Sequence, residues 1–306
     1  MRALLAAVDG RVSFGDVDEP VPGPDEALVQ VRAVSINRGE ALDIADSSAG
    51  SPLGWDLAGV VLRAADSGGP QPGTRVVGVP GERAWATLAC VNVDHLAPIP
   101  DDVSDEDAAA LPVAGLTALR LLRRLGNLRG RSVVITGASG GVGHLAVQLA
   151  ATDGARVVAV SRDPSRAAAL RQSGASQVVA DLADLQGPVD GVLESVGGAS
   201  LEHALRLVGP GGRVLTFGAS SAESATLPPF WFGPRHDACL SGFTIFSDLD
   251  ANAAAADLEY LLEQTRTGAL RPEIGLTVDW RHADDAVCRL LDRTVAGKIV
   301  LRVGHS

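Results

Sequence analysis

Three glycines at regular spacing stand between a short apolar run and a stretch that favours a helix. Gly137, Gly140 and Gly143 follow the β-branched residues 132–136 and lead into residues 144–151. Glycines at such a junction let backbone N–H groups and the helix N-terminus approach the pyrophosphate of a dinucleotide closely. The context therefore predicts a dinucleotide-binding turn, although the spacing is GxxGxxG rather than the commoner GxGxxG. A tight turn without a ligand is the alternative.

The end of the next apolar run indicates which dinucleotide is bound. Residues 156–160 end at Ser161 and Arg162, where NAD-selective enzymes usually present an acidic residue to the ribose. A hydroxyl and a guanidinium suit a 2'-phosphate, because Arg offers a charged fork of donors to phosphate oxygens, and Arg166 lies one helical turn further on. NADPH is therefore the expected cofactor. Two alternatives stay open: Asp163 reaches the ribose if the strand ends later, and Ser161 is only a helix cap.

Strand-like and helix-like stretches alternate around this turn. We expect strands at 133–136, 156–160, 177–180, 191–195 and 213–217, and helices at 141–152, 164–173 and 201–208. Such alternation predicts right-handed βαβ units around a parallel sheet. Beyond it, we expect helices at 253–268 and 282–296 and a last strand at 298–303.

The first hundred residues have a different character. Short β-branched runs separated by Gly, Pro and Asp are typical of a β-rich, barrel-like domain. They are residues 27–34, 57–62, 75–79 and 85–91. After them, Ser104 is expected to cap an Ala-rich helix, and a second helix is expected at 116–125. The chain is therefore predicted to be an α/β protein that combines a β-rich domain with a doubly wound parallel sheet.

Composition excludes several function classes. The net charge of −11 argues against a general nucleic-acid binder, which needs clustered Lys and Arg, and Lys298 is the only lysine. No apolar run reaches the roughly 18 residues of a membrane span, and the N-terminal stretch lacks signal-peptide features. We expect a cytoplasmic enzyme with no nucleic-acid or membrane partner. The scattered Cys90, Cys239 and Cys288 predict buried free thiols rather than disulfides or a structural zinc site.

Four separated motifs resemble the zinc-independent quinone oxidoreductase and zeta-crystallin branch of the medium-chain dehydrogenases/reductases. In chain order they are residues 111–118, 137–143, 209–214 and 297–301. The resemblance runs nearly end to end. It implies a GroES-like catalytic domain over 1–117, with 248–306 returning to it, and a Rossmann NADP-binding domain over 118–247.

The same resemblance implies an enzyme without zinc. Zinc-dependent relatives carry a cysteine ligand in the segment that matches Ser35–Arg38 and a Gly-His-Glu in the segment that matches Gly54–Asp56. This chain has Asn37 and Trp55 there, which cannot replace a thiolate and an imidazole at a tetrahedral zinc. Without a metal to polarise a carbonyl, the enzyme needs either a substrate that is already electron-poor or a protein donor that replaces the metal. A quinone or an α,β-unsaturated carbonyl meets the first condition.

Site residues follow from the resemblance together with the two motifs. Asn37 and Thr117 are the expected catalytic residues, with a local turn contact and helix packing as the alternatives. Asn37, Trp55 and Trp231 are expected in the substrate pocket, and core packing explains the tryptophans, including Trp85, equally well. The expected cofactor-binding residues are Ser139, Gly140, Gly141, Val142, Ser161, Arg162, Arg166, Val196, Phe217, Gly218, Phe243, Thr244 and Lys298. For Lys298 the alternative is a surface lysine that begins the last strand.

Assembly and alternative functions complete the expectations. Residues 239–246 resemble the edge strand through which family members form dimers, so we expect a homodimer, with residues 228–234 as a lid or a dimer contact. A related branch reduces enoyl thioesters with a tyrosine donor after the segment that contains Asn37, whereas this chain has only Tyr260. The missing tyrosine counts against such a reductase unless Arg38, Asp43 or an ordered water donates instead, so an enone or enoyl reductase of a secondary-metabolite pathway stays one alternative. A non-catalytic NADPH-binding sensor is the other.

Overall fold

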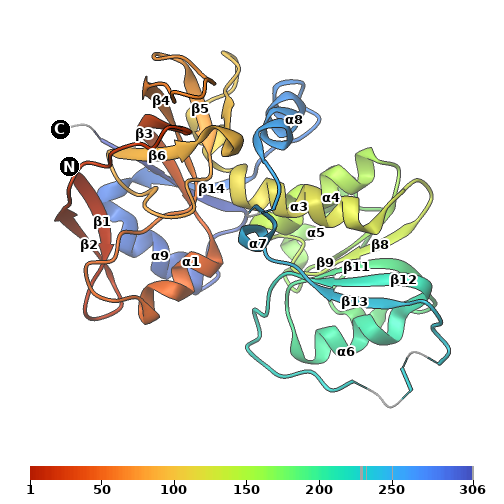
Figure 1. The fold of residues 1–306 in the computed structure, drawn as a ribbon. Helices are drawn as coiled ribbons and strands as arrows, with labels where there is room; N and C mark the ends of the chain where they lie inside the picture. The colour runs from red at the N-terminus through yellow and green to blue at the C-terminus, as the bar shows by residue number, and fades with distance from the viewer. Residues whose placement is uncertain (228–229, 232, 250, 305–306) are drawn as a thin grey trace. The chain divides into compact units, whose positions relative to one another are not determined.

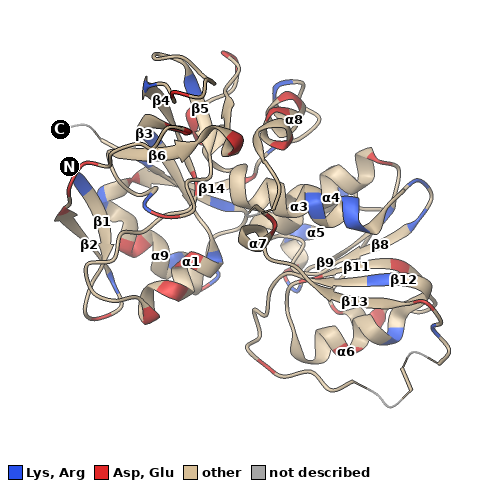
Figure 2. Cartoon of the chain, viewed as in Figure 1, with Lys and Arg blue, Asp and Glu red and all other residues tan. Residues whose placement is uncertain are grey.

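The computed structural model describes residues 1–227, 230–231, 233–249 and 251–304 and divides the chain into two compact units (Figure 1). Unit 1 comprises Met1–Leu116 and Leu249–Ser306, and unit 2 comprises Thr117–Asp248. Acidic and basic residues are interspersed along the elements of each unit (Figure 2). Among the described residues, no helix has the length and apolar character that crossing a membrane requires.

Unit 1 is built on a mostly antiparallel seven-stranded sheet in the order β14-β15-β3-β4-β5-β7, with β6 also paired to β3. Its strands are β3 (Glu26–Ile36), β4 (Leu57–Arg63), β5 (Arg75–Gly78), β6 (Leu88–Asn92), β7 (Leu96–Pro98), β14 (Ile274–Asp279) and β15 (Lys298–Arg302). A separate hairpin pairs β1 (Arg2–Ala6) with β2 (Val12–Asp16). Because β15 pairs antiparallel with β3, the last strand of the chain completes the N-terminal sheet.

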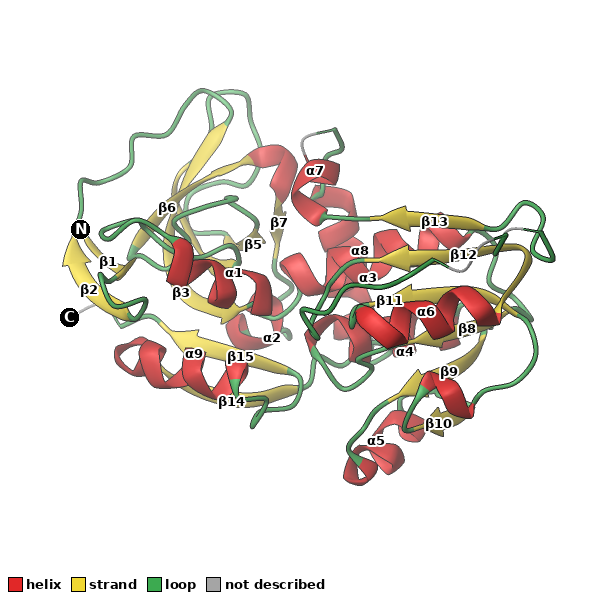
Figure 3. Cartoon of the chain, turned by 90° about the horizontal axis from the view of Figure 1, so that it is seen from below, coloured by secondary structure: helices red, strands yellow, loops and turns green. Residues whose placement is uncertain are grey.

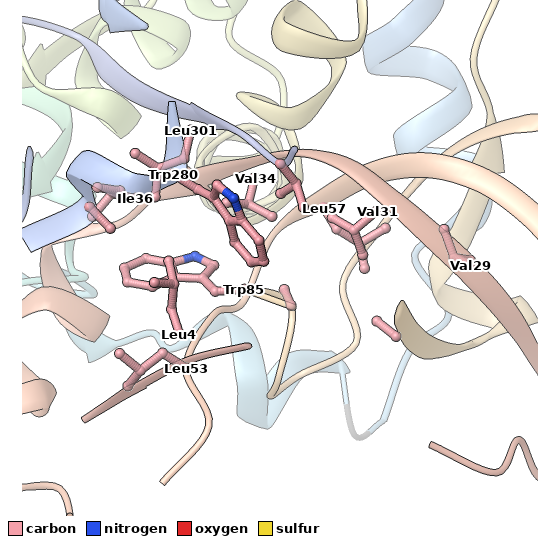
Figure 4. Packing of buried hydrophobic residues seen from close by; sticks show 14 of the residues in the cluster. Leu4, Val29, Val31, Val34, Ile36, Leu53, Leu57, Trp85, Trp280 and Leu301 are labelled. Carbon is pink, nitrogen blue, oxygen red and sulfur yellow. The ribbon is translucent and has the colours of Figure 1, made fainter. Parts of the chain in front are cut away.

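Alternation along β3 explains where the core of unit 1 lies. Val29, Val31 and other inward residues of β3 are fully buried and belong to the same cluster as Trp85 and Trp280, with Val34 and Ile36 nearer the two tryptophans in Figure 4. Trp85 is 0% exposed, so core packing is the correct interpretation of this residue. The helices of unit 1 are α1 (Arg38–Asp43), α2 (Asp105–Ala109), α8 (Ala255–Arg266) and α9 (Ala283–Leu291), with 3-10 turns η1 (Ile44–Asp46), η2 (Val93–His95) and η5 (Trp280–His282). The Ser104 side chain accepts from Asp107 N and caps α2, as the sequence predicts.

Unit 2 contains a six-stranded parallel sheet in the order β10-β9-β8-β11-β12-β13. The strands are β8 (Ser132–Ile135), β9 (Arg156–Val160), β10 (Gln177–Val179), β11 (Val189–Glu194), β12 (Val208–Thr216) and β13 (Cys239–Gly242). Its helices are α4 (Gly141–Thr152), α5 (Ala167–Gln172), α6 (Gly198–Leu207) and α7 (Ile245–Leu249), with η3 (Pro164–Arg166) and η4 (Leu182–Asp184), and α3 (Pro112–Leu125) begins in unit 1 and continues into unit 2. Helices α4 and α6 cover opposite faces of the sheet (Figures 1 and 3). This is the Rossmann-like architecture predicted from the alternation of strands and helices.

Two expectations from the sequence are wrong. The edge strand expected over 239–246 stops at Gly242, because Thr244 O accepts from Asp248 N and the Thr244 hydroxyl accepts from Ser247 N at 3.4 Å, which starts α7. The cysteines are also more exposed than expected. Cys288 is exposed because it lies on α9 outside the buried positions of that helix, and Cys90 and Cys239 are only partly buried.

Candidate functional site

The glycine-rich turn lies between β8 and α4, where the sequence places it. Gly137 has a φ of +58°, which is a conformation that glycine adopts readily at the end of a strand. A Cβ atom at Gly143 would lie 2.3 Å from Gly137 O and 2.7 Å from Ala138 Cα. Only glycine therefore allows the first turn of α4 to pack this closely on the strand end. The turn follows the carboxyl end of β8, the side on which open parallel sheets bind ligands.

The residues expected to select the cofactor gather beside this turn. The hydroxyls of Ser161 and Ser139 lie 3.5 Å apart and link the end of β9 to the glycine-rich turn. Arg162 is exposed and Arg166 is half-buried within η3. Asp163 caps η3, since its Oδ1 accepts from Ser165 N at 2.9 Å, and the hydrogen bonds from Ser165 hold the pKa of this carboxyl below its usual value. One carboxylate oxygen of Asp163 is therefore already engaged locally, which favours the 2'-phosphate interpretation.

A pocket of about 510 Å³ lies at the carboxyl ends of β12 and β13. Four of its lining residues, Phe217, Gly218, Phe243 and Thr244, are among those expected to bind the cofactor. The full lining is Thr216, Phe217, Gly218, Ala219, Gly242, Phe243, Thr244 and Ser247. The structure therefore brings together residues from two strand ends that the sequence only placed one by one. The half-buried Val196, also expected here, lies outside this lining at the end of β11.

The Phe243 wall of the pocket is held by charged residues that the sequence did not predict. The guanidinium carbon of Arg124 lies 4.8 Å from the centre of the Phe243 ring, a cation–π contact. Asp248 binds Arg124 at 2.6 Å and also forms an ion pair with Arg120. Side chains of Arg120 and Asp248 are only 7% and 8% exposed, so this ion pair is well shielded from water. These contacts anchor α7, and with it one wall of the pocket, to α3.

Unit 1 holds a second candidate site, a buried polar cluster around Asn37. The side chains of Glu40, Asp56 and Lys298 lie in it, and these residues are 4%, 0% and 2% exposed. The register of β15 against β3 pairs Ile299 with Ile36, which brings Lys298 next to Asn37. Among these residues Asn37 is the one that reaches the surface, since it is only partly buried. We refer to Asn37, Glu40, Asp56 and Lys298 as the Asn37 cluster.

Hydrogen bonds connect all four members of the Asn37 cluster. The Lys298 ammonium donates to Asn37 Oδ1 at 2.6 Å, to Ile36 O at 3.3 Å and to Asp56 Oδ2 at 3.5 Å. Asn37 Nδ2 donates to Asp56 Oδ2 at 2.7 Å and to Glu40 Oε1 at 3.1 Å. Each of the three ammonium protons thus has an acceptor, as a buried charge requires.

Backbone N–H groups complete the coordination of the two carboxyls. Glu40 Oε1 accepts from Asn37 N at 2.5 Å, which is one half of a capping box at the start of α1, and its Oε2 accepts from Trp55 N at 2.9 Å. Asp56 Oδ1 accepts from Val113 N at 2.8 Å. The cluster therefore ties α1, β4 and the start of α3 to one another.

Burial dominates the electrostatics of the Asn37 cluster. Burial and the neighbouring Asp56 raise the pKa of Glu40 from 4.5 to about 8, against the opposing effects of the Asn37 N–H groups and Lys298. Burial lowers the pKa of Lys298 from 10.5, whereas Asp56 and Glu40 oppose that change. Two carboxyls share one ammonium, so a proton on Glu40 makes the cluster neutral. A neutral cluster is the favourable state in an environment with so little water.

The Asn37 cluster does not fit a zinc ion. It offers no thiolate or imidazole, and the ammonium of Lys298 already engages the oxygens of Asn37 and Asp56. In the part of the chain that the structure describes, no group of three or more His, Cys, Asp or Glu residues is arranged to hold a metal ion. Zinc independence itself stays a prediction.

The remaining expected residues are placed as follows. Thr117 is 6% exposed on α3, which is compatible with the helix-packing alternative. Trp55 is partly exposed next to Gly39, and Trp231 packs against the core of unit 2. Part of the expected lid, Pro228, Pro229 and Phe232, lies outside the described residues.

Sequence reasoning missed Glu40 and did not assign a role to Asp56. The available signal was the Asn-x-x-Glu spacing of Asn37 and Glu40, which is a capping-box pattern. Lys298 was expected to contact the cofactor. The structure buries its side chain, and its ammonium donates to Asn37 Oδ1, while the cofactor contact itself stays a prediction.

Comparison with known proteins gives a consistent family. The zinc-binding dehydrogenase family matches residues 141–260. The spectinabilin polyketide synthase system protein NorB of Streptomyces orinoci is 36% identical over 91% of this chain, and the chain spans only 13% of NorB. An acryloyl-coenzyme A reductase of Metallosphaera sedula is 26% identical over 94% of this chain and 95% of the reductase. The quinone oxidoreductase from Coxiella burnetii has the same fold, with a TM-score of 0.85, 25% identity and 99% coverage of both chains.

Proposed function

Because the chain belongs to the medium-chain dehydrogenase/reductase family, we propose that it is an NADPH-dependent oxidoreductase that reduces quinones or other conjugated carbonyls without zinc. The observation that carries this proposal is the glycine-rich turn at the carboxyl end of β8 with Ser161 and Arg162 beside it. The turn suits the pyrophosphate that both nicotinamide dinucleotides share, and a basic residue in place of an acid at the end of β9 favours NADPH over NADH.

The residues of unit 2 divide the binding of NADPH between them. Backbone N–H groups of the turn and the N-terminus of α4 hold the pyrophosphate, and Ser161 and Arg162 bind the 2'-phosphate. The pocket lined by Phe217 and Phe243 receives a flat part of the ligand against its aromatic side chains. When bound, NADPH supplies the hydride. Asn37 in unit 1 and Thr117 in unit 2 are the proposed catalytic residues.

The substrate class follows from what the Asn37 cluster lacks. Its residues do not fit a metal that would polarise a carbonyl, so the substrate must accept a hydride readily by itself. Quinones and conjugated enones have this property. The resemblance of the fold to a quinone oxidoreductase supports the same class.

A second candidate is an enoyl-thioester reductase. The specific observation in its favour is that the similarity to an acryloyl-coenzyme A reductase extends over nearly all of both chains. The similarity to a segment of a polyketide synthase system points the same way. Tyr260, the only tyrosine of the chain, lies on α8 rather than in the segment after Asn37.

The assembly that we propose is a homodimer through β13. This strand is at the end of the sheet order, and Leu240 on it is 36% exposed. An unpaired edge of this kind favours pairing with a second copy. Sedimentation of the wild type and of Leu240→Lys tests it, since a charge on the edge should shift the protein towards monomer, and two monomeric proteins would contradict it.

The function is tested by following NADPH oxidation with benzoquinone, phenanthrenequinone, simple enones and crotonyl-coenzyme A in parallel. We expect turnover of quinones with NADPH preferred over NADH. Arg162→Ala should lose most of that preference, whereas Arg171→Ala, the same change at an exposed site on α5, should keep it. Turnover confined to the thioester would favour the second candidate. Tight NADPH binding without any oxidation would indicate a non-catalytic sensor.

A further inference from the structure

The side-chain amide of Asn37 is almost completely used inside unit 1. An amide has two N–H donors and two acceptor lone pairs. Both donors are engaged, one by Asp56 Oδ2 at 2.7 Å and one by Glu40 Oε1 at 3.1 Å. One lone pair of Oδ1 accepts from Lys298 Nζ at 2.6 Å. A single acceptor position on Oδ1 therefore remains for any other molecule.

The chemistry of the neighbours determines which way the amide faces. An ammonium can only donate, and an ionised carboxylate can only accept. Turning the amide by half a rotation would place its NH2 against Lys298 and its oxygen against Asp56, which replaces two charge-assisted hydrogen bonds by two repulsive contacts. The orientation is therefore set from beneath, by buried charges, and a ligand that needs a donor cannot reverse it.

The amide of Asn37 reaches the surface, whereas the side chains that orient it are buried. Lys298 and Asp56 are 2% and 0% exposed, whereas Asn37 is only partly buried. A ligand at this end of β3 thus meets Asn37, and the buried groups act on that ligand only through the amide.

We propose that Lys298, Asp56 and Glu40 are positioning residues that present Asn37 to bound molecules solely as a hydrogen-bond acceptor. The ligand group at Asn37 is then an N–H or O–H donor, such as the carboxamide or a hydroxyl of the dinucleotide. It is not the carbonyl oxygen that is reduced. This inference rests on the proposed function only for the presence of a dinucleotide and a substrate at Asn37.

The central experiment is a binding cycle that needs no turnover. Dissociation constants are measured by cofactor fluorescence for NADPH and for its reduced acetylpyridine analogue, in which a methyl group replaces the carboxamide NH2. The proteins are the wild type and Asn37→Ala. If the carboxamide is the donor, the analogue should bind about fivefold more weakly to the wild type, which corresponds to one hydrogen bond. For Asn37→Ala, the analogue and NADPH should have equal dissociation constants.

A second arm identifies a hydroxyl donor. The cycle is repeated with NADPH that lacks the 2'-hydroxyl of the nicotinamide ribose. Loss of about fivefold in the wild type, absent in Asn37→Ala, would support the proposal with the hydroxyl as the source. Coupling of Asn37 to neither group would overturn the proposal.

The positioning role needs a readout that stability alone does not move. Lys298→Met should weaken the measured coupling between Asn37 and the cofactor group, and Lys298→Arg should restore part of it because it keeps the cation. Val61→Ala, a core change in the same unit, should lower stability and leave the coupling intact. Equal loss of coupling in Lys298→Met and Val61→Ala would reduce the cluster to a structural role and overturn the proposal.

Activity gives an independent check against the opposite role. If Asn37 donated to the reacting carbonyl, Asn37→Ala would lose progressively more kcat as the substrate became less electron-poor. The acceptor role predicts the same fold-loss for quinones and enones. Wild-type protein that binds NADPH but reduces none of these substrates would refute the proposed function, while the binding cycles would still decide the role of Asn37.

Discussion

Replacing Glu40 by Gln should remove a pH dependence from the stability of unit 1. The Glu40 carboxyl is fully buried next to Asp56, and its pKa rises from 4.5 to about 8 in the folded protein. Gln has nearly the same shape and does not titrate. The variant therefore isolates the contribution of one buried proton.

The sign and the size follow from the two pKa values. Between pH 4.5 and about 8 the folded protein holds a proton on Glu40 that the unfolded chain has released. The contribution of Glu40 to the free energy of unfolding is therefore fully present below pH 4.5, and it is lost as the pH rises towards about 8. The slope reaches about 1.4 kcal/mol per pH unit, so from about pH 5.5 to 7.5 the wild type should lose roughly 2 to 3 kcal/mol relative to Glu40→Gln.

Urea unfolding at several pH values measures this difference. Tryptophan fluorescence is a suitable probe, because Trp55, Trp85 and Trp280 all belong to unit 1. Titrating groups away from Glu40 are common to both proteins and cancel in the difference, whereas Lys298, which faces Glu40 from β15, titrates together with it. Glu19→Gln, the same change at an exposed position, is the matched control and should run parallel to the wild type.

The opposite outcome is physically meaningful. Three N–H groups, from Asn37 and Trp55, donate to the Glu40 carboxyl and favour its ionised form. If they outweigh burial and Asp56, the pKa of Glu40 in the folded protein lies below 4.5, and the wild type gains stability relative to Glu40→Gln as the pH rises towards that value. Parallel curves from about pH 5.5 to 7.5 would mean that folding does not raise the pKa of Glu40. Either result would refute the neutral cluster described above.

Three further outcomes are expected. In Gly143→Ala the new Cβ would lie 2.3 Å from Gly137 O. The variant should therefore lose roughly 1 to 3 kcal/mol of stability and bind NADPH at least tenfold more weakly in calorimetry. Unchanged affinity for NADPH would contradict a phosphate-binding role of the turn. Lys298→Met should destabilise unit 1 by roughly 3 to 5 kcal/mol in urea unfolding, since the buried Asp56 loses its cation; a change below about 1 kcal/mol would argue against a charged Lys298. Asp248→Asn should raise the KM for NADPH with little change in kcat, because Asp248 no longer holds Arg124 against the ring of Phe243. An unaltered KM would place the pocket lined by Phe243 outside the cofactor site.

The sequence could predict those parts of the protein that depend on local patterns. Glycine spacing between an apolar run and a helix located the turn at Gly137 to Gly143, and both flanking elements were found at nearly their observed bounds. Alternating strands and helices predicted the parallel sheet, since only one handedness of connection packs well. The edge strand was overextended because the start of α7 depends on a capping contact of Thr244, which apolar content does not reveal.

The pocket walls show an intermediate case. Phe217 and Phe243 were placed individually at strand ends, but their adjacency follows from β13 pairing with β12. Asp248 binds Arg120 and Arg124, which lie 128 and 124 residues away from it in the sequence. No periodicity in the sequence reports a contact of that kind.

Apart from the local contact of Asn37 with Glu40, the Asn37 cluster was decided by tertiary structure. Lys298 and Asp56 are 242 residues apart, and they meet because β15 pairs antiparallel with β3 beside the start of β4. From the sequence, Lys298 is equally well an exposed residue that begins a strand. In the fold its ammonium is held by Asn37, Ile36 and Asp56 and orients the amide of Asn37, because a charge removed from water must find partners in its surroundings. Residue types and spacing thus determined the fold and the cofactor turn, whereas the burial that gives Asn37 its direction exists only once distant strands are packed.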